Sequence, residues 1–205
     1  MRVGFTAAAG SSFSIFLLSL LTLAGGCVEN DPNGPKTEGT VRNGSFEMPE
    51  TDAPYVRMAP GLSLDGWTIA DAPIDLVSDY WRAADGRQSV HISRGATLSQ
   101  ELLTTPGRTY ELQFAAAANA DPDGQNPTKH LVVMWGPKTV DSIAMDARMH
   151  RRDEMGWRYY AYPVKATSSR TVLRFSCEEK EEWGAALDRV RLAPAPAGTT
   201  VAQSK

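Results

Sequence analysis

The chain has little of what marks catalytic, metal-binding or nucleic-acid-binding proteins. Its 205 residues include two cysteines and three histidines, and the formal net charge is −3. The histidines, His91, His130 and His150, are scattered, and no Cys/His spacing typical of a metal site is present. The chain has no basic cluster, so nucleic acid is not an expected partner. No HExxH, GxSxG or glycine-rich phosphate loop is found, so no motif predicts an enzyme.

Long hydrophobic runs are also missing after the N-terminal region, so no interior membrane span is expected. The N-terminus itself has an early Arg2, an apolar run over 13–23 and small residues before Cys27, which is the pattern of a secretory signal peptide. The stretch LAGGC resembles the bacterial lipoprotein box. That resemblance implies a lipidated Cys27 and a membrane anchor in the cell envelope. Ordinary signal cleavage that leaves Cys27 free is the alternative.

Composition divides the chain into four parts. Residues 1–26 are the expected signal peptide. Residues 27–39 are polar and rich in Pro, Gly and Asn, which predicts a flexible tether, and residues 193–205 are expected to form a disordered tail. The folded domain is therefore predicted over 40–192. If Cys27 carries lipid, Cys177 has no partner within the chain, and its place on an apolar strand face predicts a small buried hydrophobe.

Within the predicted domain the hydrophobic pattern indicates β-structure. Tyr110, Leu112 and Phe114 alternate with polar residues, and similar runs lie at 88–93, 130–135, 157–164, 171–177 and 183–192. Turn sequences such as ADG, TPG and DPDG separate these runs. About eight short strands with this spacing predict an antiparallel β-sandwich of the jelly-roll type. The stretch from 140 to 155 fits either one helical turn or a long loop.

Three stretches occur in an order that resembles a known family: NGSFEMPE, then LDGWTIADAPIDLVSDYWRAADGRQSVHIS, then WGAALDRVRL. Together they resemble the bacterial choice-of-anchor C and DUF642-type domains, over nearly all of residues 41–192. The resemblance implies a galactose-binding-like jelly roll. It also implies a carbohydrate-binding-like module, with polysaccharide as the partner and no particular sugar specified.

One carboxylate needs an explanation. Counting back by two along the last predicted strand from Leu192 through Val190 places Asp188 on the apolar face, where an unpaired carboxylate is costly. In related jelly-roll modules, the glutamate of NG-x-FE and the aspartate of the last strand meet at a structural calcium ion, which implies Glu47 and Asp188 as ligands here. Calcium prefers several oxygen ligands, which suits these residues. An ion pair with an arginine, or hydrogen bonds to loop amides, would also account for Asp188.

The candidate ligand surface is the polar loop SDYWRAADGRQS. It holds the aromatic pair Tyr80 and Trp81 beside Asp85 and Arg87, which is the combination of flat rings and polar groups expected at a sugar site. Trp81 could equally be a buried packing residue that closes the end of the sandwich. Trp67 and Trp157 begin predicted strands and are expected to serve packing.

Two functions from different classes remain open at this point. The first is a non-catalytic module on the cell surface that recognises cell-wall or extracellular polysaccharide. The second is a structural or adhesion lipoprotein that binds a protein and no sugar. A small hydrolase is the least favoured reading, because nothing in the sequence pairs two acidic residues in a cleft.

Overall fold

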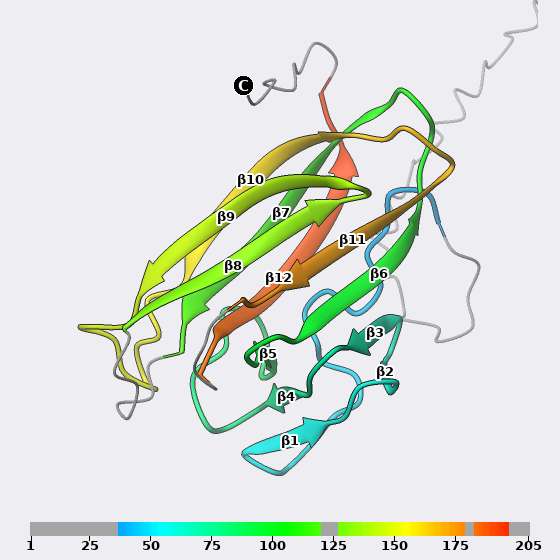
Figure 1. Cartoon of the computed structure of the whole chain (residues 1–205). Coiled ribbons are helices and arrows are strands. Elements are labelled where there is room, and N and C mark those ends of the chain that lie inside the picture. Colours follow the sequence, from blue (N-terminus) through cyan, green and yellow to red (C-terminus); the bar gives the residue numbers. More distant parts are fainter. Residues whose placement is uncertain (1–36, 120–126, 179–182, 197–205) are drawn as a thin grey trace, which may run out of the picture.

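The computed structural model describes residues 37–119, 127–178 and 183–196. The described residues form twelve β-strands and no helix (Figure 1). The expected signal peptide, Cys27, most of the expected tether and the end of the expected tail lie outside them. No helix in the described ranges is long and apolar enough to span a membrane.

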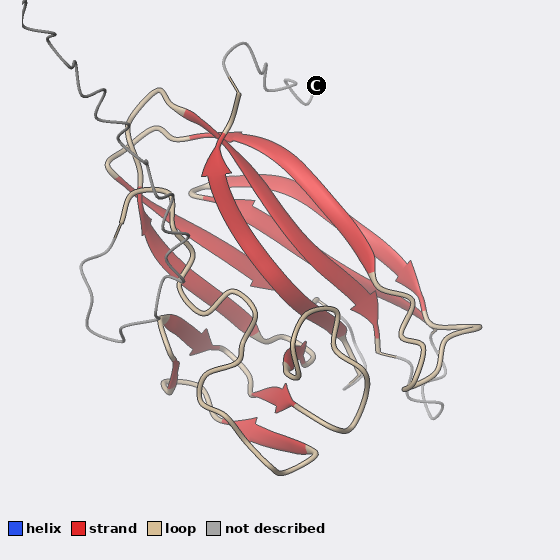
Figure 2. Ribbon diagram, turned by 180° about the vertical axis from the view of Figure 1, so that it is seen from behind, coloured by secondary structure: helices blue, strands red, loops and turns tan. Residues whose placement is uncertain are grey.

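The strands form two six-stranded sheets in which every pair of neighbours is antiparallel. The first sheet, nearer the viewer in Figure 2, has the order β1 (Tyr55–Met58), β4 (Ile74–Val77), β5 (Ser89–Ile92), β12 (Ala185–Pro194), β7 (Thr109–Ala118) and β10 (Arg158–Lys165). The second sheet has the order β2 (Ser63–Leu64), β3 (Trp67–Ala70), β6 (Thr97–Leu103), β11 (Arg170–Ser176), β8 (Thr128–Trp135) and β9 (Lys138–Asp146). The predicted all-β antiparallel sandwich is confirmed, with more strands than the eight expected.

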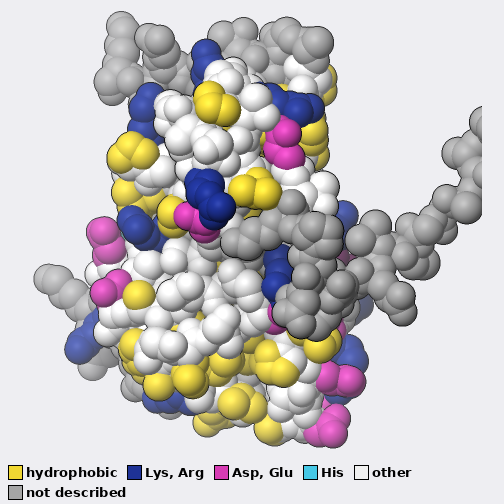
Figure 3. Space-filling model, turned by 90° about the vertical axis from the view of Figure 1, so that its right-hand side faces the viewer, with side chains coloured by type: hydrophobic (Ala, Val, Ile, Leu, Met, Phe, Trp, Pro, Cys, Tyr) yellow, Lys and Arg dark blue, Asp and Glu magenta, His cyan; other side chains and the backbone are white. Residues whose placement is uncertain are grey.

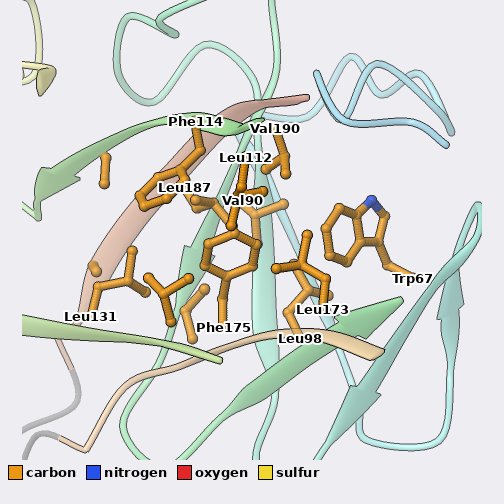
Figure 4. Close-up of a cluster of buried hydrophobic side chains, with 14 of the residues drawn as sticks. Trp67, Val90, Leu98, Leu112, Phe114, Leu131, Leu173, Phe175, Leu187 and Val190 are labelled. Carbon is orange, nitrogen blue, oxygen red and sulfur yellow. The ribbon is translucent and has the colours of Figure 1, made fainter. Parts of the chain in front are cut away.

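Alternation along the strands explains why they pair in two layers. In β8 every second residue is buried, and β6 and β11 follow the same rule. The buried side chains of the two sheets meet in one large core around Trp67, Phe114 and Phe175 (Figure 4). Cys177 belongs to this core, as predicted, and so does Trp67.

The stretch from 140 to 155 contains no helical turn. It begins within β9, which runs to Asp146, and continues as a loop over 147–157 with one isolated bridge between Arg151 and Glu154. This 147–157 loop matters for the site because it lies against a second loop, residues 78–88. The backbone N–H of Arg82 donates to the carbonyl of Arg152 (2.9 Å), and Trp157 Nε1 donates to the carbonyl of Arg82 (2.9 Å).

The two loops pack on the outer face of the first sheet, the face turned away from the main core. There Val77, Trp81, Ala117, Met155 and Ala186 form a second, smaller hydrophobic cluster. The first sheet is therefore apolar on both faces in this region, and β4 and β5 are buried along their whole length. A sheet that is buried on both sides can hold polar side chains in a protected place.

The last strand contains a β-bulge that changes the direction of Asp188. Between Asp188 and Arg191 the register against β7 shifts by one residue, and Arg189 has a positive φ of 52°. As a result Leu187 and Val190 face the main core, and Asp188 does not share their face. The expectation that Asp188 points to the apolar side with Val190 is therefore wrong, because the extra residue breaks the period of two.

Hydrophobic side chains are also exposed at the end of the molecule where β1 and β2 lie (Figure 3). The largest of them there are Tyr55, Val56 and Leu62. Tyr55 shares its strand face with Arg57, opposite Val77 and Asp75 of β4. This places Tyr55 at the rim of the outer face of the first sheet.

Candidate functional site

A pocket opens on the outer face of the first sheet, between β1, β4 and β5 and the 78–88 loop. Its volume is about 80 Å³. It is lined by Tyr55, Arg57, Asp75, Val77, Tyr80, Trp81, His91, Asn119 and Trp183. Four of these nine residues are aromatic, and most of the others are polar or charged.

The aromatic rings of the pocket form a continuous chain. Tyr55 meets Tyr80 edge to face with ring centroids 5.5 Å apart, and Tyr80 meets Trp81 in the same way at 5.9 Å. The chain continues from Trp81 to His91 at 6.0 Å and from His91 to Trp183 at 6.1 Å. These contacts support one another, so the walls of the pocket are held in place before any ligand arrives.

The polar groups in the pocket centre on a buried pair. Asp75 and His91 are opposite each other in β4 and β5, and His91 Nδ1 lies 2.9 Å from Asp75 Oδ2. His91 Nε2 accepts the backbone N–H of Gly184 (3.0 Å), so the ring proton is on Nδ1 and is donated to Asp75. Because both ring nitrogens are engaged, His91 has no free lone pair to act as a general base.

Two carboxylates hold the 78–88 loop over the sheet. Asp188 Oδ2 accepts the backbone N–H groups of Ala84 and Asp85, both at 2.9 Å. Glu47 Oε1 accepts those of Arg87 and Gln88, also at 2.9 Å. The first and last segments of the domain thus bind consecutive amides of one loop, and we call this arrangement the loop clamp.

Two glycines of the motifs are required by the same arrangement. A Cβ at Gly44 would lie 1.9 Å from the carbonyl oxygen of Val190, and one at Gly86 would lie 2.3 Å from Glu47 Oε1. Gly86 also has a positive φ of 63°. The three stretches that carry the family resemblance therefore meet at the loop clamp, which positions Tyr80 and Trp81 without itself lining the pocket.

Burial raises the pKa of the Asp188 carboxyl to about 7, although the backbone N–H groups of Asp85, Arg189 and Ala84 act to lower it. The side chain is fully buried, and the cost of removing a carboxylate from water exceeds what three neutral donors return.

The contacts of Glu47 and Asp188 in this structure are with backbone N–H groups. Their oxygens face N–H groups, whose positive ends would also face a cation. In the described part of the chain no group of three or more His, Cys, Asp or Glu side chains could hold a metal ion. Calcium binding by these residues stays a prediction, while their hydrogen bonds to loop amides match the alternative named for Asp188.

The predicted ligand loop is only partly at the pocket. Tyr80 is half-buried and lines it, whereas Trp81 is 5% exposed and donates from Nε1 to Ser89 Oγ (2.8 Å). This corrects the expectation of an open Trp81 platform: the ring covers the sheet and forms the floor of the pocket. Asp85 lines neither this pocket nor the hollow beside it and pairs with Arg191 (2.9 Å), whereas Arg87 faces that neighbouring hollow. Trp157 serves packing, as expected.

Sequence reasoning did not assign Tyr55, Asp75, Asn119 or Trp183 to the site. Asp75 and His91 do carry a signal, because each is a polar residue inside a short, otherwise apolar strand segment. The register that brings them together joins strands that the sequence alone cannot align.

Comparison with solved structures finds β-sandwich modules of low similarity. They include a family 35 carbohydrate-binding module from Clostridium thermocellum (13% identity, TM-score 0.46, covering 70% of this chain and all of that one). They also include the CBM22-1 xylan-binding domain from Paenibacillus barcinonensis (13% identity, TM-score 0.49, covering 80% of this chain and all of that one). No curated protein matches the chain. The model of the family described as "Protein of unknown function (DUF642)" matches residues 39–193, and the chain therefore belongs to the DUF642 family.

Proposed function

We propose that the protein is a non-catalytic carbohydrate-binding module, and that its pocket binds a sugar of a cell-wall or extracellular polysaccharide. The observation that carries this proposal is the combination of aromatic walls with a buried, incompletely hydrogen-bonded carboxylate. A sugar ring offers apolar C–H faces that pack on aromatic rings, and its hydroxyls need acceptors fixed at defined positions.

Asp75 supplies such an acceptor. Its Oδ2 is engaged by His91, whereas its Oδ1 is buried and accepts no hydrogen bond from the described residues. Nε of Arg57 lies 3.4 Å from Oδ1, so a donor and an acceptor stand side by side at the pocket. Buried polar atoms are normally hydrogen-bonded, and a sugar hydroxyl would satisfy this one.

Tyr55 offers the sharpest test of the pocket. Its side chain is 52% exposed, so Tyr55→Ala should leave the fold intact. We expect this variant to weaken glycan binding by at least about 1 kcal/mol, the scale of losing an aromatic hot spot. A glycan array finds the ligand, and titration calorimetry then compares the variants.

Tyr159→Ala is the matched control. Tyr159 is a similarly exposed tyrosine on β10, outside the pocket, where it packs with Arg189 (5.5 Å from the guanidinium carbon to the ring centroid). It should bind glycan like the wild type. Equal affinities for wild type and Tyr55→Ala, or a wild-type protein that retains no glycan on the array, would count against the proposal.

We further propose that the module is held at the cell envelope through lipid on Cys27, which lies outside the described residues. The support is the small-residue box directly before this cysteine. Stable attachment requires more than one acyl chain. Cys27→Ser should release soluble protein or block processing, as measured by fractionation of cells, and membrane recovery equal to wild type would refute the anchor.

Protein binding is the second candidate function. The observation in its favour is the group of exposed apolar side chains at the β1 and β2 end, above all Val56 and Leu62. A glycan array without hits, together with loss of a protein partner in Leu62→Asp, would favour this function over sugar binding.

A further inference from the structure

A second and wider hollow lies next to the pocket, on the other side of Tyr80. Its volume is about 450 Å³. Tyr80 and Trp81 line both spaces, so the two are neighbours that share these rings as a wall. A chain of sugars that places one unit in the pocket has room to place the next one here.

Arginine dominates the walls of this hollow. Arg82, Arg87 and Arg152 line it, against the carboxylates of Asp79 and Asp153. The Asp153 carboxylate is paired outside the hollow with Arg151, at 3.5 Å. The positive charge in the hollow is therefore only partly compensated.

The three arginines differ in the contacts that their guanidinium groups make. The guanidinium of Arg152 stacks on the Tyr80 ring, 3.9 Å from its centroid, and also donates to its hydroxyl. Arg87 donates to Glu50 (3.1 Å) and also pairs with Asp79, whose Oδ2 lies 3.9 Å from the Arg87 guanidinium. Arg82 is held only through its backbone, and within the described ranges its guanidinium has no ion pair or hydrogen bond.

Ser78 adds an independent observation. It is 2% exposed and lines the hollow, yet among the described residues its Oγ has no hydrogen-bond partner. A hydroxyl is both donor and acceptor, and a buried hydroxyl normally finds a partner. A ligand oxygen would accept a hydrogen bond from the Ser78 hydroxyl.

We propose that this hollow is a second subsite that binds an oxyanion, a carboxylate or a sulfate, carried by the glycan whose neighbouring sugar occupies the pocket. The inference rests on the proposed function and deepens it, because it names acidic polysaccharide as the ligand class. Arg82 supplies the planar pair of N–H donors that matches an oxyanion, and Ser78 supplies a further donor. Arg152, fixed on Tyr80, contributes charge at the boundary between the two subsites.

The test uses the full chain and a panel of oligosaccharide pairs that share a backbone and differ only in charge. One arm pairs uronate oligosaccharides with their methyl esters, and the other pairs sulfated with desulfated oligosaccharides. We expect the wild type to bind the anionic member of at least one arm about tenfold more tightly, a preference that shrinks when salt is raised from 50 to 500 mM because exposed charges are screened. The arm that shows the preference identifies the oxyanion.

Arg82→Gln should reduce that preference to about onefold, because the variant loses more affinity for the anionic member than for the neutral one. Arg94→Gln is the control: it removes the same charge from an exposed position between β5 and β6, outside both spaces, and should keep the preference. Equal binding of both members in each arm, with neutral binding still dependent on Tyr55, overturns the oxyanion subsite and leaves the proposed function standing. If no glycan of either charge is bound, the proposed function fails and the subsite fails with it.

Discussion

Trp81→Ala should lower the free energy of unfolding by about 3–5 kcal/mol, the usual cost of removing a large buried aromatic side chain. The ring is 5% exposed, packs with Val77, Ala117, Met155 and Ala186, and donates to Ser89. Its removal leaves a cavity under the 78–88 loop. For a domain of this size the melting temperature should fall by roughly 10 °C, as measured by calorimetry.

Trp81→Phe separates packing from the hydrogen bond. It keeps an aromatic ring in the cluster but leaves Ser89 Oγ without its donor, so the loss of stability should be clearly smaller than for alanine. If Trp81→Ala melts like the wild type and only its glycan affinity falls, the ring belongs to an open platform and its assignment to the second hydrophobic cluster is wrong.

The contribution of Asp188 to the free energy of unfolding should fall as the pH rises from about 4 to 7. Its folded-state pKa of about 7 lies above 3.8, the ordinary pKa of an aspartate carboxyl in water. Over that window the folded state holds the proton and the unfolded state has lost it. The contribution is therefore fully present below the unfolded pKa and is lost as the pH passes the folded pKa. A shift of this size corresponds to on the order of 4 kcal/mol.

The measurement compares wild type with Asp188→Asn in chemical denaturation from pH 4 to 8, with EDTA present so that no metal contributes. The unfolding free energy of wild type minus that of the variant should fall as the pH rises. Asp146→Asn is the control, because Arg148 lowers the pKa of the exposed Asp146 to about 2 and its contribution is lost only below the window. A constant difference between wild type and Asp188→Asn would contradict the raised pKa.

Wild type and Asp188→Ala together test calcium binding. Thermal melts with EDTA and with added calcium compare the ion-free and ion-loaded states, since a ligand that binds only the folded state raises its stability. A melting temperature that rises with calcium in wild type but not in Asp188→Ala would support a calcium ion at Glu47 and Asp188. Equal melts under both conditions would leave the loop clamp as the sole role of these carboxylates.

The fold class and most of the strands follow from the amino-acid sequence alone. Alternation of apolar and polar residues is a local property, so β7, β8 and β11 could be located without knowledge of their partners. The same alternation placed Cys177 in the core. The ordered motifs predicted the family. The structure gives their residues a shared role, because Gly44, Glu47, Gly86 and Asp188 build the loop clamp.

The tertiary structure alone decided the direction of Asp188 and the membership of the pocket. The bulge at Arg189 is a single inserted residue with positive φ, and arginine, unlike glycine or asparagine, gives no sign of that conformation. The pocket joins Tyr55 and Asp75 to Trp183, more than 100 residues later in the chain. Contact between residues so far apart in sequence depends on the order and register of the strands. Both are set by the packing of whole strands, and the residues next to Tyr55, Asp75 or Trp183 in the sequence do not reveal them.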